Sequence, residues 1–206
     1  MEQLVKISDF LDKVITKIAK VAAWAGVALI LVTIFDVVTR RFFVLGSTKL
    51  QELEWHFHTI LFAFCLGFAY LKDSHVRIDI VRERLSERTQ WWIELSGCLF
   101  FLLPYCALVT YFAYDFTVRS FQIGEISASA TGLSHRWIIK SAIPIGFALL
   151  GLSGIVITLR KIVELFGPPD LRKKVHDTEE QEVEHLDDMT DIPRPAGPAG
   201  TAGSGG

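Results

Sequence analysis

The charged and imidazole side chains that could carry chemistry in this 206-residue chain lie mostly beside long apolar stretches. Asp36 and Arg40 are one helical turn apart, a spacing that allows an ion pair on a helix. Two interpretations of this pair stay open: an ion pair at the lipid headgroups, or an acid that faces another protein helix. Glu52 and Glu54 precede an apolar stretch, where the positive end of a helix dipole favours them.

The histidines and cysteines do not have the spacing of a metal site. His56 and His58 are two residues apart and therefore point to different sides of a helix, and His135 is distant in sequence. The three cysteines form no CxxC pair and are expected to be small apolar fillers. They are Cys65, Cys98 and Cys106. We therefore expect no metal, no cofactor and no enzymatic activity.

Four long apolar stretches must position these residues. They lie near 21–39, 55–71, 92–114 and 138–159. A bilayer core needs about 20 mostly apolar residues in a helix, and the lack of two-residue alternation favours helices over barrel strands. Half of the residues are hydrophobic and the net charge is −2, which does not indicate a nucleic-acid partner. The sequence predicts an all-α membrane protein with four transmembrane helices.

The lysines and arginines predict the orientation of these helices. If both termini are inside, fifteen lysines and arginines lie on the inner side and six on the outer side. The positive-inside rule then favours an N-in, C-in topology with the loops 40–54 and 115–137 outside. The first apolar run has no cleavage site after it, so we expect the first span to remain in the mature protein.

The chain divides into three regions. Residues 1–20 have helical spacing of apolar positions such as Ile7, Phe10 and Ile15, with lysines between them. This amphipathic segment either lies on the cytoplasmic membrane surface or extends the first span into water. Residues 21–166 form the four-helix membrane domain, and residues 167–206 are expected to be a disordered cytoplasmic tail.

Several ordered motifs resemble one known family, the small membrane subunit (DctQ or SiaQ type) of tripartite ATP-independent periplasmic (TRAP) transporters. They are LQELEWHFH at 50–58, Gly67, DSHVRIDI at 73–80, VTRRFF at 38–43, LLPYC at 102–106 and GEISASATGLSHRWIIKSAIPIGFALL at 124–150. The resemblance covers about residues 15–166, and the last motif is similar to the mannitol/chloroaromatic or 2-oxo acid branch. One departure is LSG at 152–154, where a glutamine before the glycine is expected.

The resemblance implies a scaffold in the bacterial inner membrane. Its partners would be a large sodium-coupled elevator subunit, a periplasmic substrate-binding protein and phospholipid, and the system would take up organic acids.

The resemblance also implies roles for individual residues. Contacts with the large subunit would involve Asp36, Arg40, Glu52 and Glu54. The inner interfacial segment would depend on His75, Arg77 and Asp79, and lipid headgroups would meet Arg77, Arg82 and Arg84. The binding protein would dock on Glu125, Ser127, Ser129 and Arg136.

Two other functions remain open. A membrane anchor for b-type haem needs histidines that face each other at one depth, whereas His56, His58 and His135 share one side. A small self-sufficient homo-oligomeric transporter would carry its own ion path, and the chain shows neither an intramembrane cluster of acids nor an internal repeat.

Overall fold

The computed structural model describes residues 1–43, 46–72, 85–173 and 175, with Glu87 described by its backbone alone. The described part consists of helices and the connections between them. Its helices are α1 (Glu2–Phe43), α2 (Thr48–Leu71), α4 (Glu87–Gly97), the π-helix η1 (Cys98–Leu102), α5 (Leu103–Gln122) and α6 (Trp137–Phe166). Each predicted apolar stretch lies inside one helix or, for 92–114, inside the continuous run from α4 to α5.

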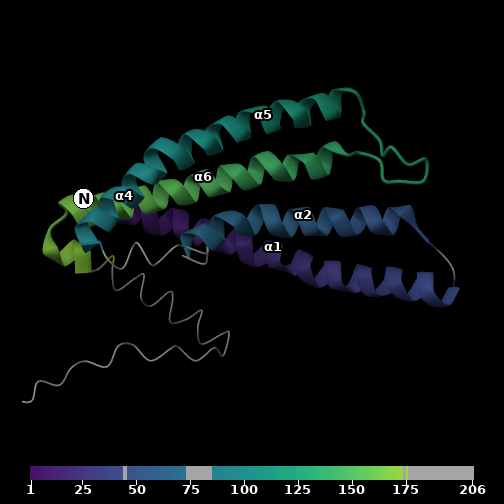
Figure 1. Cartoon of the computed structure of the whole chain (residues 1–206), viewed down its shortest axis with the longest axis horizontal. Helices are drawn as coiled ribbons and strands as arrows, with labels where there is room; N and C mark the ends of the chain where they lie inside the picture. The colour runs from purple at the N-terminus through teal and green to yellow at the C-terminus, as the bar shows by residue number, and fades with distance from the viewer. Residues whose placement is uncertain (44–45, 73–84, 174, 176–206) are drawn as a thin grey trace, which may run out of the picture.

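The helices run up and down along the long axis of the molecule (Figure 1). The N-terminus, the end of α2, α4 and the end of α6 lie together at one end, which we call the terminal end. The connections from α1 to α2 and from α5 to α6 lie at the opposite end, which we call the loop end. Both ends of the helical bundle therefore gather residues that are far apart in the sequence.

Helix α6 is the centre of the bundle and packs against α1, α2, α4 and α5. Glycines allow the closest approach between α2 and α6. A Cβ atom on Gly67 would meet the carbonyl oxygen of Leu149 at 2.9 Å, and one on Gly146 would meet the carbonyl oxygen of Ala63 at 2.6 Å. In lipid, helices associate through such close packing of small residues, because the hydrophobic effect does not separate one apolar helix from another.

The third helical run contains a π-turn immediately before Pro104. Proline has no N–H and its ring clashes with the carbonyl four residues earlier. The backbone N–H of Leu103 bonds to the carbonyl of Cys98, five residues back, which is the π-helical spacing. The change of spacing lets the run continue from Glu87 to Gln122 without ending at the proline.

At the terminal end, α1 packs into the bundle, whereas at the loop end it is largely exposed. Its buried residues are Val5, Ser8, Asp12, Ile15, Ala19, Ala22 and Asp36. Ile15 joins the core formed with Leu71, Cys98, Val156 and Ile157. Ile7 and Phe10 are exposed, so the buried face is narrower than the apolar pattern of residues 1–20 predicts.

The chain turns back after α6. Arg172 donates to the carbonyl oxygens of Gly167 (2.8 Å) and Leu165 (3.2 Å), which satisfies acceptors at the helix end. Val175 then packs with Val5 and Val163. Val175 belongs to the region 167–206 that the sequence analysis assigns to the tail, and here it packs against the N-terminal turns of α1.

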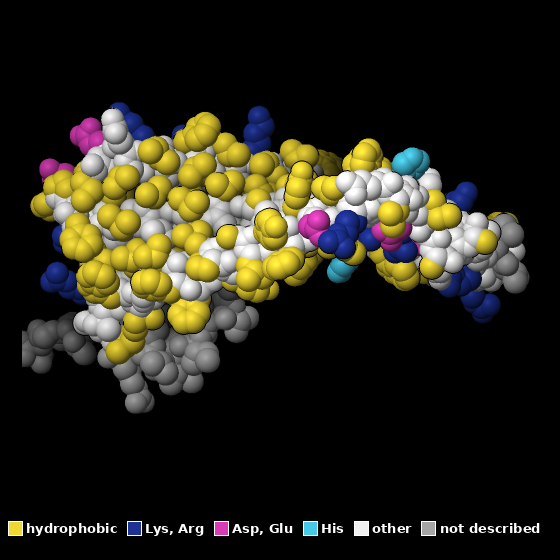
Figure 2. Space-filling model, turned by 90° about the horizontal axis from the view of Figure 1, so that it is seen from above, with side chains coloured by type: hydrophobic (Ala, Val, Ile, Leu, Met, Phe, Trp, Pro, Cys, Tyr) yellow, Lys and Arg dark blue, Asp and Glu magenta, His cyan; other side chains and the backbone are white. Residues whose placement is uncertain are grey.

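Three helical runs are long and apolar enough to cross a membrane: Glu2–Phe43, Arg88–Gln122 and Trp137–Phe166. Helix α2 falls short of this apolarity because its first turns carry acids and histidines, namely Glu52, Glu54, His56 and His58. In Figure 2 hydrophobic side chains gather over the left and middle of the molecule, whereas charged side chains and histidines interrupt them toward the right end. The bundle thus presents the apolar exterior of a membrane protein.

Candidate functional site

The connection from α5 to α6, residues 123–136, lies over the start of α2 at the loop end. Glu52 is buried, with 6% of its surface exposed, and its carboxylate faces this loop. One oxygen accepts a hydrogen bond from the Ser127 hydroxyl, and the other accepts from the backbone N–H of Leu133 at 2.6 Å. The Ser127 hydroxyl in turn accepts from the backbone N–H of Ser129 at 3.1 Å. Glu52 therefore links α2 to both arms of the loop.

The same hydrogen bonds lower the pKa of the Glu52 carboxyl. The backbone N–H of Leu133 lowers the pKa of the Glu52 carboxyl most, followed by the Ser127 hydroxyl, and Arg136 and His56 act in the same direction. Burial opposes this shift because it disfavours the charged form. The hydrogen bonds outweigh burial, so the pKa lies below its ordinary value.

An ion pair closes the base of the loop. The Lys140 ammonium group on α6 donates to the Glu125 carboxylate and lies 3.8 Å above the ring of Phe116 on α5. The hydrogen bond from Lys140 is the largest cause of the lowered pKa of Glu125. The N–H of Arg136 donates to the carbonyl of Glu125 at 3.2 Å, which joins the two ends of the loop.

Asp36 and Arg40 form the i, i+4 ion pair that their spacing allows. The carboxylate is buried, whereas 48% of the Arg40 side chain is exposed. When the Gln51 amide is oriented with its oxygen toward Arg40, the oxygen lies 2.9 Å from one guanidinium nitrogen and joins α1 to α2. Glu54 is half-buried. Thus Arg40 is the most accessible member of the four residues that the sequence assigns to the large-subunit interface.

The described histidines stay at the loop end and do not gather. A ring nitrogen of His56 lies against the carbonyl oxygen of Glu52, and His135 contacts the Ser134 hydroxyl at 3.0 Å. Within residues 1–43, 46–72, 85–173 and 175, no group of three or more His, Cys, Asp or Glu side chains could hold a metal ion.

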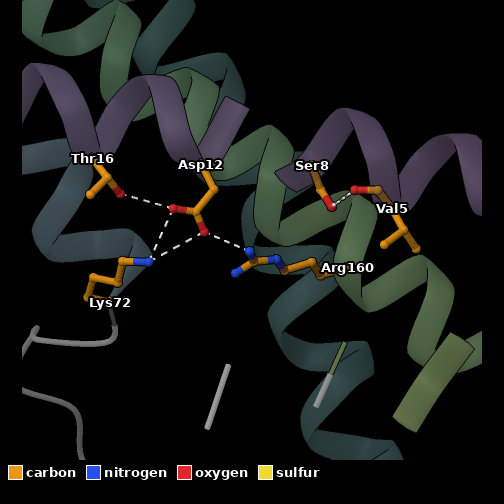
Figure 3. Close-up of polar contacts among 6 residues, drawn as sticks. All are labelled: Val5, Ser8, Asp12, Thr16, Lys72 and Arg160. Carbon is orange, nitrogen blue, oxygen red and sulfur yellow. Dashed lines mark hydrogen bonds and ion pairs between the residues drawn. The ribbon is translucent and has the colours of Figure 1, made fainter. Parts of the chain in front are cut away.

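The terminal end contains a buried charge cluster that the sequence interpretation missed (Figure 3). The Asp12 carboxylate on α1 accepts from the Arg160 guanidinium on α6 at 2.6 Å and from the Lys72 ammonium at the end of α2 at 3.1 Å. The Thr16 hydroxyl donates to the same carboxylate at 3.0 Å. The side chains of Asp12, Lys72 and Arg160 are each only 4–5% exposed. One acid thus connects three helices.

A signal for Asp12 was present in the sequence. The buried residues Val5, Ser8, Asp12, Ile15, Ala19 and Ala22 alternate in steps of three and four, the spacing of a helix–helix seam. A charged acid inside such a seam is costly unless cations or hydrogen-bond donors of the facing helices satisfy it. Only the folded chain identifies these cations, because Arg160 is 148 residues away.

A neighbouring ion pair joins α4 to α6 at the same end. The Lys161 ammonium lies 2.9 Å from the carboxylate of Glu164, one turn further on, and 3.7 Å from that of Glu94 on α4. Five other predicted site residues, His75, Arg77, Asp79, Arg82 and Arg84, lie outside the described residues. Their roles remain predictions.

The geometry defines a multi-pass helical membrane protein in which charges at the two bundle ends pair within the chain. The sequence matches the model of one family over residues 29–164: tripartite ATP-independent periplasmic transporters, DctQ component. The match covers more than half of the chain, so the chain belongs to this family and is a small membrane subunit of a TRAP transporter. The family resemblance seen in the motifs is confirmed. The family is a transporter component and not an enzyme family. Comparison with curated proteins finds no significant match.

Proposed function

We propose that this subunit is a fixed frame for the large membrane subunit of its transporter and a docking surface for the periplasmic binding protein. The observation that carries the first role is the distribution of exposed apolar surface. After Ala22, Asp36 is the only buried residue of α1. On α5, only Cys106 and Ser120 are buried. These two helices offer apolar faces to lipid or to a larger neighbour in the membrane.

We further propose that all four helical runs cross the membrane, including α2. Charged residues recur on each run near both ends of the bundle. From Glu52 to Lys72 on α2, and from Lys140 to Arg160 on α6, the rise is about 30 Å at 1.5 Å per residue. On α1 the stretch without a charged residue, between Lys20 and Asp36, rises about 24 Å, and the long Lys20 side chain can extend toward the membrane surface. These lengths are close to a hydrocarbon core of roughly 30 Å.

The proposed orientation places the terminal end in the cytoplasm. The N-terminus and the end of α6 lie at that end in the up-and-down bundle, and the balance of lysines and arginines favours it. The loop end would then face the periplasm, where the binding protein approaches. Glu125, Ser127, Ser129 and Arg136 all lie in this loop. Ser127 is buried under it, whereas Glu125, Ser129 and Arg136 are half-buried and are therefore the more accessible of these four.

The transported cargo and its driving force follow from the family only as proposals. We propose uptake of organic acids, of the mannitol/chloroaromatic or 2-oxo acid branch, driven by a sodium gradient through the large subunit. We also keep the proposal that phospholipid headgroups meet Arg77, Arg82 and Arg84, and that His75, Arg77 and Asp79 fix the inner interfacial segment. These five residues lie outside the described part of the chain.

Co-purification with the large subunit encoded beside this chain tests the frame role. Arg40→Glu should weaken the complex, because Arg40 is exposed at the loop end of α1. Arg41→Glu is a matched control: it makes the same charge change at an exposed neighbour that points elsewhere on the helix. Equal recovery of the complex with both variants would contradict the Arg40 assignment. Flux through liposomes that contain this chain alone would contradict the frame role itself.

A further inference from the structure

Glu52 closes the loop between α5 and α6 from underneath. The backbone N–H of Ser127 donates to the carbonyl of Leu133 at 3.1 Å, so these two residues face each other across the loop. The carboxylate of Glu52 bonds to the side chain of Ser127 and to the backbone of Leu133. Two sets of contacts therefore hold Ser127 and Leu133 together: the hydrogen bond between their own backbones, and the hydrogen bonds that both make to Glu52.

Close packing around the carboxylate fixes its position. A Cβ atom on Gly132 would meet a carboxylate oxygen of Glu52 at 2.7 Å, so the loop backbone approaches the acid as closely as only glycine permits. The Thr131 hydroxyl also donates to the Thr48 hydroxyl, at 3.2 Å, in the first turn of α2. The contact between loop and helix is thus built around Glu52 and does not depend on a large apolar core.

A glutamine in place of Glu52 could not make the same contacts. Both hydrogen-bonding partners are donors, and a carboxylate presents an acceptor oxygen to each of them. A glutamine amide has one acceptor oxygen and an NH₂ group that would face the second donor. An uncharged isostere of the same size therefore removes the charge from both hydrogen bonds, and the Ser127 hydroxyl would have to accept from the NH₂ group instead of donating to a carboxylate.

The outward side of the loop is accessible. Ile123 and Ile126 are 75% and 68% exposed, and Ser134 and His135 are also exposed. We propose that Glu52 is a positioning residue: it holds residues 123–136 in the conformation that receives the periplasmic binding protein, without itself touching that protein. This inference rests on the proposed function. It assigns to Glu52 a role in the loop and not at the large-subunit interface.

The test uses the complete reconstituted transporter, with uptake measured as the concentration of binding protein is varied. Glu52→Gln should raise the half-saturating concentration of binding protein about tenfold, the loss expected from one charge-assisted hydrogen bond. The maximal rate and the co-purification of the two membrane subunits should stay close to wild type. Asp115→Asn is the matched control, because Asp115 is an exposed acid at the same end of the molecule.

Three outcomes separate the possibilities. An unchanged half-saturating concentration in Glu52→Gln would overturn this inference. A fall in subunit co-purification with unchanged half-saturation would also overturn it, and would return Glu52 to the large-subunit interface. Uptake by the wild type that does not respond to binding protein would overturn the proposed function instead.

A second variant covers the case in which Glu52→Gln does not fold. Ser127→Ala removes one of the two hydrogen bonds from the loop side and leaves α2 intact. It should raise the half-saturating concentration in the same direction by a smaller factor, and wild-type behaviour in this variant would also count against the proposal.

Discussion

Asp12 is buried between Lys72 and Arg160, cations that come from two other helices. Asp12→Asn keeps the shape of the side chain but removes the negative charge from between them. Loss of one partner from a buried ion pair costs about 3 kcal/mol or more. We therefore expect a lower free energy of unfolding in detergent, measured by reversible denaturation.

The neighbouring Asp9 provides the control for that measurement. Asp9 lies on the same helix, is only half-buried, and has no ion pair among the described residues. Asp9→Asn should change stability by less than about 0.5 kcal/mol, the range of ordinary surface substitutions. An equal loss in both variants would mean that Asp12 contributes as general helix charge and not through its two cations.

The acids of the loop end predict a pH dependence of loop order. The pKa values of Glu52 and Glu125 are lowered in the folded chain, so the stability that they contribute is fully present above the ordinary glutamate pKa of about 4.3. It is lost only as pH falls through the lowered values. Exchange of the Leu133 amide hydrogen, corrected for its intrinsic rate, should be constant from about pH 8 to pH 5 and should accelerate at lower pH. Acceleration near pH 6 to 7 would contradict the assignment to these carboxyl groups.

At the scale of the helices, the crossing of α2 and α6 depends on glycine. A Cβ atom on Gly146 would meet the Cβ of Ala63 at 2.8 Å as well as its carbonyl, and backbone cannot move as a flexible side chain does. Gly146→Ala should therefore push the helices apart and cost about 1–3 kcal/mol, as overpacking does in other cores. Gly97→Ala is the control: nothing lies within 4 Å of its Cβ position, so alanine should be neutral or stabilising. Equal thermal stability of the two variants would argue against close α2–α6 packing.

The helices could be predicted from the sequence because a span is a local property. A run of about 20 apolar residues can be recognised as a helix without knowledge of the fold. All four stretches lie within helices of the structure. The helix ends were less predictable. Helix α1 begins at Glu2, well before the apolar stretch, because its amphipathic turns pack on α6 and on Val175.

The site was predictable only in part, for the same physical reason. The Asp36–Arg40 pair lies within one turn, so its spacing already predicts it. Glu52 was recognised as an important acid, but its partners Ser127 and Leu133 are about 80 residues away and belong to a loop without periodicity. Such contacts are set by how α6 and α2 cross, which no local pattern records.

At the scale of the whole molecule, the two charged layers divide the surface into an apolar band and two polar ends. Much of the apolar surface of α1 and α5 is not used for packing within the chain, since each of these helices buries few side chains. This arrangement suits a subunit whose helices are completed by lipid and by a neighbour. Among the described residues it also gathers charged side chains at the two ends, where soluble partners can make polar contacts.

The proposed four-span topology can be tested at one exposed position near the start of α1 and at one in each connection that follows α1, α2 and α5, because α2 carries too many polar residues to be assigned from apolarity alone. Single cysteines would be introduced after the three native cysteines are replaced by alanine. The positions are Lys6, Gly46, Ser86 and Ser134, all exposed. In intact cells, a membrane-impermeant maleimide should label Gly46→Cys and Ser134→Cys, whereas Lys6→Cys and Ser86→Cys should react only after permeabilisation. Labelling of Ser86→Cys from outside would mean that α2 does not cross. The charged residues about 30 Å apart at the two ends of α2 would then not mark the two membrane surfaces. The subunit would have three transmembrane helices instead of four.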